Sequence, residues 1–125
     1  MNIEKVVRVS LILAGPLNLT AATMFLFPSA PIIGLIQLPD NSHPFYQILS
    51  AGLVALFGAA YLWLAFQTTI LRPLLLLGAV GKLFAGSLAI YLAVAGALAP
   101  ITGALVAGDL VFATLWLYYL LSNLR

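Results

Sequence analysis

Residues 74–95 read LLLLGAVGKLFAGSLAIYLAVA, an apolar run with a single charge, Lys82, near its middle. A helix rises 1.5 Å per residue, so about 20 residues cross the ~30 Å hydrocarbon core of a bilayer. The run has this length and predicts a membrane-spanning helix. A charge in hydrocarbon costs roughly 2.5–3.5 kcal/mol on insertion scales, so we expect Lys82 to face the protein interior.

Three further apolar runs of similar length surround this one, at about residues 6–27, 46–66 and 101–121. The composition agrees, since 64% of the residues are hydrophobic and only 6% are charged, with a mean hydropathy of +1.17. A soluble domain has about 25% charged residues. The sequence therefore predicts an all-α integral membrane protein, with residues 1–125 forming a single domain of four transmembrane helices. The links 67–73 and 96–100 are short, which favours an antiparallel bundle.

The longest link, residues 28–45, contains four prolines and many apolar side chains. Proline interrupts a spanning helix, and the apolar residues are unusual for a solvated loop. We therefore expect a short interfacial segment on the outer side of the membrane. Asn41 or Ser42 is expected to cap the second helix, with Pro44 in its first turn.

The basic residues outside the apolar runs predict the orientation. With the N-terminus inside, Lys5, Arg8, Arg72 and Arg125 all lie on the cytoplasmic side. Basic residues are enriched in cytoplasmic segments, so we expect both termini in the cytoplasm of a multi-pass protein of the bacterial inner (plasma) membrane.

The composition also disfavours several classes of function. The chain has no cysteine and one histidine, His43, which leaves too few ligands for a usual zinc or haem site. We predict no metal, no cofactor and no catalytic residue. A formal net charge of +2 in so apolar a chain gives no indication of nucleic-acid binding. The expected partners are the lipid bilayer and either a lipid-like small molecule or another membrane subunit, and a homo-oligomer is compatible with both.

Four polar residues are predicted to share one layer of the bundle. Counted at 1.5 Å per residue from the cytoplasmic ends, Lys82, Asp109, Asn18 and Tyr61 lie at depths of ~12–20 Å. Lys82 and Asp109 are therefore expected to form an ion pair. Asn18 and Tyr61 would supply the remaining hydrogen bonds. Small residues lie three and four positions away from Lys82 on its helix, as on packing faces between membrane helices. They leave either a closed bundle or a small pocket beside the polar layer.

Two interpretations of this layer are open. The ion pair either sets the register of the bundle or belongs to a site for a substrate, an ion or a proton. The leading hypothesis is a non-enzymatic accessory or assembly protein that binds a small amphipathic molecule or a partner helix. The second is a minimal transporter or proton-conducting element that uses Asp109 and Lys82. The third is an intramembrane enzyme with Asp109 and Tyr61 in acid/base roles on a lipid-like substrate. The enzyme hypothesis ranks last because an enzyme normally needs more catalytic groups than one carboxylate, one amine and one phenol.

The overall plan has four helices in 125 residues, a long first outer loop, Arg72-Pro73 opening the third helix and Gly81-Lys82 within it. In this plan the chain resembles the DoxX-like superfamily of small bacterial membrane proteins. The resemblance implies a four-helix membrane bundle, and some members of the superfamily look like accessory subunits or maturation factors of membrane redox systems.

Overall fold

The computed structural model describes residues 2–27, 34, 37–39 and 43–124. These residues form α1 (Ile3–Leu26), α3 (Pro44–Ala65), α4 (Arg72–Val94), α5 (Pro100–Ala107) and α6 (Asp109–Ser122), with no strand among them. The interfacial segment expected between the first two helices lies largely outside the described residues.

Each of the first two long helices begins at a side-chain cap. Asn2 accepts a hydrogen bond from the backbone N–H of Glu4 at 2.9 Å, and α1 follows directly. His43 caps α3, since its Nδ1 accepts a hydrogen bond from the backbone N–H of Phe45 at 3.1 Å. Pro44 follows at the first helical position, where its missing N–H costs nothing. The expectation of a cap at Asn41 or Ser42, which lie outside the described residues, was therefore wrong, and His43 has this role.

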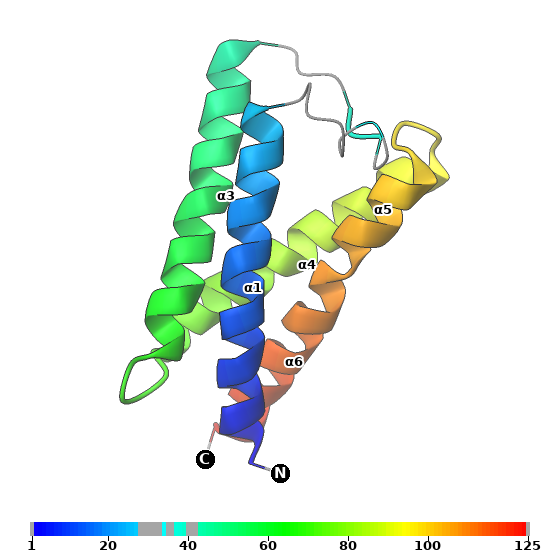
Figure 1. Ribbon diagram of the computed structural model, residues 1–125. Coiled ribbons are helices and arrows are strands. Elements are labelled where there is room, and N and C mark those ends of the chain that lie inside the picture. The colour runs from blue at the N-terminus through cyan, green and yellow to red at the C-terminus, as the bar shows by residue number, and fades with distance from the viewer. Residues whose placement is uncertain (1, 28–33, 35–36, 40–42, 125) are drawn as a thin grey trace.

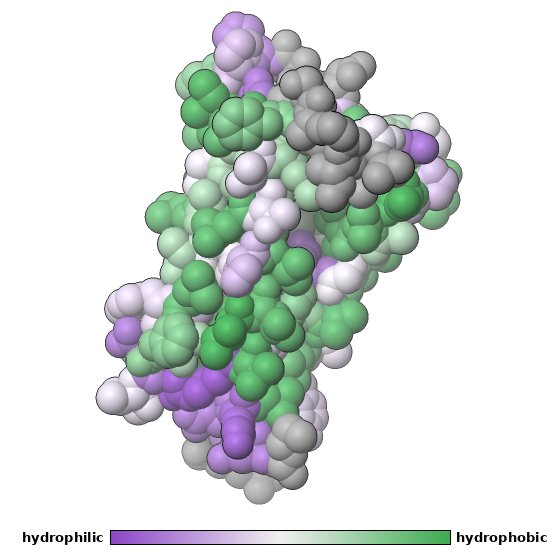
Figure 2. Space-filling view, in the orientation of Figure 1, coloured by the Kyte–Doolittle hydropathy of each residue, from purple (hydrophilic) through white to green (hydrophobic). Residues whose placement is uncertain are grey.

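The prediction of four membrane-length helices is confirmed. The segments Ile3–Leu26, Pro44–Ala65, Arg72–Val94 and Pro100–Ser122 are each long and apolar enough to cross a membrane. They begin between one and three residues before the predicted spans. Figure 2 shows a broad apolar surface between hydrophilic patches near the two ends of the molecule. These features are those of a multi-pass membrane protein.

The fourth span differs from the expected uninterrupted helix, because it is divided into α5 and α6 at Gly108. Around this residue the backbone hydrogen bonds change from the four-residue spacing of an α-helix to the three-residue spacing of a 3₁₀ helix. The N–H of Gly108 reaches the carbonyl of Leu105, and the N–H of Val111 reaches the carbonyl of Gly108, each three residues back. The break places Asp109 at the first residue of α6.

The helices associate as two pairs (Figure 1). The first pair is α1 with α3, and the second pair is α4 with α5 and α6. In Figure 1, α1 crosses in front of α4, α3 lies at the left and α6 at the right, and both termini lie at the lower end.

The apolar core joins the two pairs at the end of the molecule that carries the termini. The largest fully buried side chains come from both pairs: Val7 and Leu11 of α1, Leu64 of α3, Leu75 of α4 and Trp116 of α6. Val7 and Leu11 lie early in α1, whereas Leu64 is next to the end of α3. The polar layer described below therefore lies directly beyond the core, farther from the termini.

Candidate functional site

A charged cluster connects the two helix pairs. Lys82 Nζ lies 2.9 Å from Asp109 Oδ1 and donates a second hydrogen bond, at 3.2 Å, to Asn18 Oδ1. The three residues come from α4, α6 and α1. The cluster thus includes both helix pairs, and the ion pair itself belongs to the second pair.

The close approach of α4 and α6 depends on a glycine. A Cβ atom added at Gly86, one turn along α4 from Lys82, would lie 2.7 Å from Leu110 Cγ, next to Asp109. Real Cβ atoms essentially never show such a contact, so a side chain at Gly86 would force Leu110 to shift, and its absence permits this helix spacing. Small residues have this role generally where membrane helices pack.

Two aromatic rings surround the ammonium group of Lys82. Its Nζ lies 5.3 Å from the centroid of the Tyr61 ring and 5.2 Å from that of the Phe112 ring. Both distances fall in the range of cation–π attraction. Tyr61 therefore contacts the cluster through its ring. Among the described residues its hydroxyl makes no hydrogen bond, although the sequence analysis assigned one to it.

Asn18 links three helices. Its amide nitrogen donates to the backbone carbonyl of Val54 in α3 at 3.2 Å, while its amide oxygen accepts from Lys82. The same side chain therefore holds α1 against α3 and presents an acceptor to α4. A β-carbon at Gly58 would lie 2.9 Å from Asn18 Cβ, so this contact also depends on a glycine.

The two charged partners differ in exposure. The side chain of Lys82 is only 4% exposed, and that of Asp109 is 29% exposed. Among the described residues, the Asp109 carboxylate is contacted through Oδ1, and Oδ2 accepts no hydrogen bond. The negative charge also sits in the first turn of α6, where the helix dipole favours it. The site therefore offers an accessible acceptor beside a buried cation.

Ser10 and Trp116 form a second polar contact between the pairs, which the sequence analysis missed. The indole Nε1 of Trp116 donates to Ser10 Oγ at 2.8 Å, and this hydroxyl donates to the carbonyl of Val7 at 2.6 Å. Ser10 is 7% exposed and Trp116 is fully buried. A serine inside an apolar run was the available signal, but it did not indicate which residue would pair with it.

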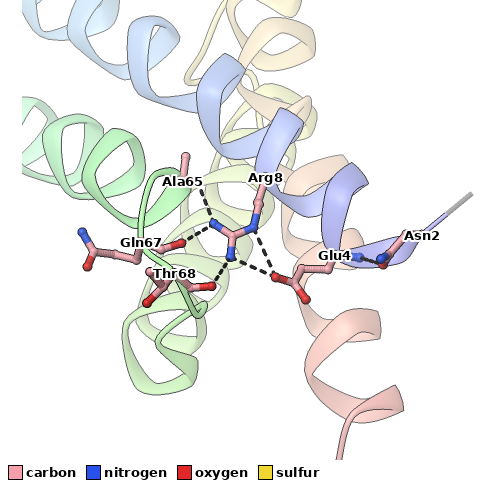
Figure 3. A network of polar contacts seen from close by, with 6 residues as sticks. All are labelled: Asn2, Glu4, Arg8, Ala65, Gln67 and Thr68. Atoms are coloured by element: carbon pink, nitrogen blue, oxygen red, sulfur yellow. Dashed lines mark hydrogen bonds and ion pairs between the residues drawn. The ribbon is translucent and has the colours of Figure 1, made fainter.

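Arg8, which the sequence indicated only as a topology signal, also contacts the C-terminal end of α3 (Figure 3). Its guanidinium donates to the backbone carbonyls of Ala65, Gln67 and Thr68 and to the carboxylate of Glu4. The carbonyls at a helix C-terminus lack partners within the helix and carry partial negative charge. Arg8 supplies both hydrogen bonds and the opposite charge at this end.

The described part of the chain holds no group of three or more His, Cys, Asp or Glu residues that could bind a metal ion. The fold and the site together define a multi-pass helical membrane protein with an ion pair between its helices, in which the lysine is buried and the aspartate is partly exposed. Comparison with protein-family models, with curated proteins and with solved structures gave no match to this chain.

Proposed function

We propose that this chain is a small, non-enzymatic protein of the bacterial inner membrane whose antiparallel four-helix bundle binds a small amphipathic molecule at the Lys82–Asp109 layer. In this role it is an accessory subunit of a larger membrane system. The resemblance to the DoxX-like superfamily supports the accessory role, and we propose that relationship as well.

The exposure of Asp109 is the observation that carries this proposal. A charge that faces lipid is costly, so an ion pair that only holds membrane helices together is expected to shield both of its charges. Here the lysine is 4% exposed and fixed by several partners, whereas the carboxylate is 29% exposed with Oδ2 unpaired among the described residues. An acceptor that opens from an apolar bundle favours a ligand with a polar head and an apolar tail.

The proposed orientation, with both termini in the cytoplasm, rests on the basic residues. Lys5, Arg8 and Arg72 belong to the end of the molecule that carries the termini. Such clustering is typical of the cytoplasmic side.

The test is to identify what copurifies with the protein. The full chain is extracted in a mild detergent, and bound small molecules are measured by native mass spectrometry. We expect a bound amphipathic molecule on the wild type and its loss in K82M/D109L, which removes the ion pair without leaving an unpaired charge. T114V changes an exposed residue of α6 and is the matched control, which should retain the molecule. A wild type free of any bound amphipath, or equal occupancy in all three proteins, would contradict the proposal.

Ion or proton conduction is the second candidate, and the break at Gly108 is the observation that favours it. A short stretch of 3₁₀ hydrogen bonding inside a helix often marks a functional position. Asp109 directly follows Gly108, where the backbone remains helical but the hydrogen bonds shorten to three residues. Proteoliposomes that hold a pH-sensitive dye would show proton flux that depends on Asp109 if this candidate is correct, and no flux if the chain only binds a ligand.

A further inference from the structure

The first helices of the two pairs, α1 and α4, show a similar pattern of buried and exposed residues. When residues 8–26 of α1 are matched with residues 72–90 of α4, most positions share the same degree of burial. The matched buried pairs are Leu11 with Leu75, Ala14 with Gly78, Gly15 with Ala79 and Ala22 with Gly86. Helices that present the same positions inward pack in the same way, so this agreement indicates a shared packing face.

The second helices of the two pairs match more closely. Residues 54–66 of α3 and 109–121 of α6 agree in burial at every position, whether buried, half-buried or exposed. Aromatic residues also stand at three matched positions, Phe57 with Phe112, Tyr61 with Trp116 and Trp63 with Tyr118. The matched buried pairs are Gly58 with Ala113, Tyr61 with Trp116, Leu64 with Tyr119 and Ala65 with Leu120.

Matched residues in the two helix pairs also make corresponding polar contacts. Arg8 donates to the carbonyl of Ala65, and its counterpart Arg72 donates to the carbonyl of Leu120, the counterpart of Ala65. In the polar layer, Asn18 donates to the backbone of Val54. The counterparts of these two residues are Lys82 and Asp109, which form the ion pair.

Matched residues also meet each other. Asn18 accepts a hydrogen bond from its counterpart Lys82 at 3.2 Å, and the ring of Tyr61 lies 5.0 Å from that of its counterpart Trp116. Equivalent residues touch across an interface only where they lie near a two-fold axis. The arrangement in Figure 1, with α1 in front of α4 and α3 opposite α6, agrees with an axis along the length of the molecule.

We propose that the two helix pairs are structural repeats related by an approximate two-fold axis through the polar layer. The second repeat alone carries the ligand site. There, Asp109 binds the head group of an uncharged amphipath that donates a hydrogen bond. This inference rests on the proposed function for the ligand and on the matched contacts for the repeat. Transport proteins with parallel repeats related by an axis along the membrane normal place their sites near the midplane in the same way.

The chemistry of the layer selects the ligand class. Lys82 and Asp109 neutralise each other, so a charged head would leave a net charge inside the membrane, which is expensive. Lys82 is buried and engaged, whereas Asp109 Oδ2 is an acceptor without a partner among the described residues. A hydroxyl group satisfies such an acceptor without adding charge, and an apolar tail is compatible with the surrounding helices.

The first experiment moves the site to the other repeat. The variant N18K/V54D/K82N/D109V exchanges the matched residues of the layer, and N18K/K82N/D109V is its control, which differs only in retaining Val54. If the repeats are equivalent, V54D supplies the missing carboxylate, and the exchanged variant should melt clearly above its control. Equal melting temperatures, or failure of the exchanged variant to fold while the control folds, would overturn the repeat.

A second measurement leaves the core intact and tests the axis directly. Spin labels are placed at exposed positions in two variants, L13C/Y118C and W63C/L77C. Leu13 is matched with Leu77 and Trp63 with Tyr118, so the two-fold axis would exchange one labelled pair with the other. A two-fold axis requires the same distance between labels in both variants. Coincident distance distributions are expected, and clearly separate maxima would overturn the repeat without reference to any ligand.

The ligand class is tested on the wild type with two probes of similar tail, oleyl alcohol and methyl oleate. Only the alcohol donates a hydrogen bond, so the alcohol alone should raise the melting temperature and appear as a bound mass. The exchanged variant should behave in the same way. Equal binding of both probes would overturn the donor requirement while leaving amphipath binding intact. Binding of neither would count against the proposed function, and the spin-label result would still decide the repeat.

Discussion

At the scale of single residues, the molecule stabilises one ammonium group inside an apolar bundle by several independent contacts. Lys82 has a carboxylate at 2.9 Å, an amide oxygen at 3.2 Å and two aromatic rings at just over 5 Å. A buried charge is tolerated only when its partners replace the lost hydration. Loss of the carboxylate should therefore leave an unfavourable cation, whereas loss of both charges should not.

We expect Asp109→Asn alone to lower the free energy of unfolding in detergent by about 3 kcal/mol, because Lys82 keeps its charge without a counter-ion. The double variant K82M/D109L should recover most of this loss. Denaturant unfolding followed by Trp fluorescence measures both. Glu4→Gln is a suitable control, because the Glu4–Arg8 pair is partly exposed and should contribute less than about 1 kcal/mol. Equal damage from the single and double changes would contradict a direct pair.

Ser10→Ala should destabilise the protein by roughly 1–3 kcal/mol, because it leaves the buried indole N–H of Trp116 without an acceptor. Thr20 makes a comparable hydrogen bond within its own helix but is exposed, so Thr20→Val should have little effect. Thermal unfolding of both variants in the same detergent gives the comparison. A similar loss of stability in both variants would show that the Ser10–Trp116 hydrogen bond contributes no more than an exposed hydrogen bond within one helix.

At the scale of helices, close packing depends on a few glycines on inward faces. A Cβ at Gly15 would lie 2.4 Å from Leu62 Cγ, and one at Gly78 would lie 2.8 Å from Tyr61 Cε1. In lipid, helix association relies on such close approach, because burying apolar side chains gains little over contact with lipid tails. The helix spacing, and with it the geometry of the polar layer, follows from these positions.

Two glycines of α3 provide a matched test of this argument. Gly58→Ala places a methyl group 2.9 Å from Asn18 Cβ and from the carbonyl oxygen of Gly15, so we expect a loss of about 1–3 kcal/mol from overpacking. Gly52 has open space around it, so Gly52→Ala should be neutral or stabilise the helix by up to about 1 kcal/mol. Equilibrium unfolding of both variants measures the difference. Equal effects would show that α1 and α3 are not held at the distance observed.

At the scale of the whole molecule, the pairs meet through a core near the termini and through the polar layer beyond it. The core includes residues of α1, α3, α4 and α6. Arg8 and Arg72 add hydrogen bonds to helix ends on the same side. The end bearing the termini is therefore the more tightly joined one, and the proposed ligand would reach Asp109 from the opposite side.

The proposed orientation predicts which links an impermeant thiol reagent reaches in intact cells. A cysteine at Ala97, in the exposed link between α4 and α5, should be labelled from outside. A cysteine at Thr69, in the exposed link between α3 and α4, should be labelled only after the membrane is permeabilised. The chain has no natural cysteine, so the background is clean. The reverse pattern would place the basic end outside, against the usual bias of membrane proteins.

The sequence by itself determined the class of protein, the approximate bounds of its four long helices and the pairing of Lys82 with Asp109. These features depend on local quantities: the length of an apolar run, and the cost of an unpaired charge within it. Two opposite charges that lie at similar depths on consecutive helices have few other charged groups with which to pair. Nothing comparable indicated that Tyr61 would present its ring to the ammonium rather than its hydroxyl.

Only the tertiary structure decided how the helices pair, where the fourth span breaks and which residues meet across the pairs. Helices that are apolar on every side carry little periodic signal for their inward face, so the sequence did not reveal that α1 matches α4 and α3 matches α6. Those matches rest on burial and on contacts such as Arg8 with Ala65 and Arg72 with Leu120. Such contacts depend on distances of closest approach between helices, which exist only after the chain has packed.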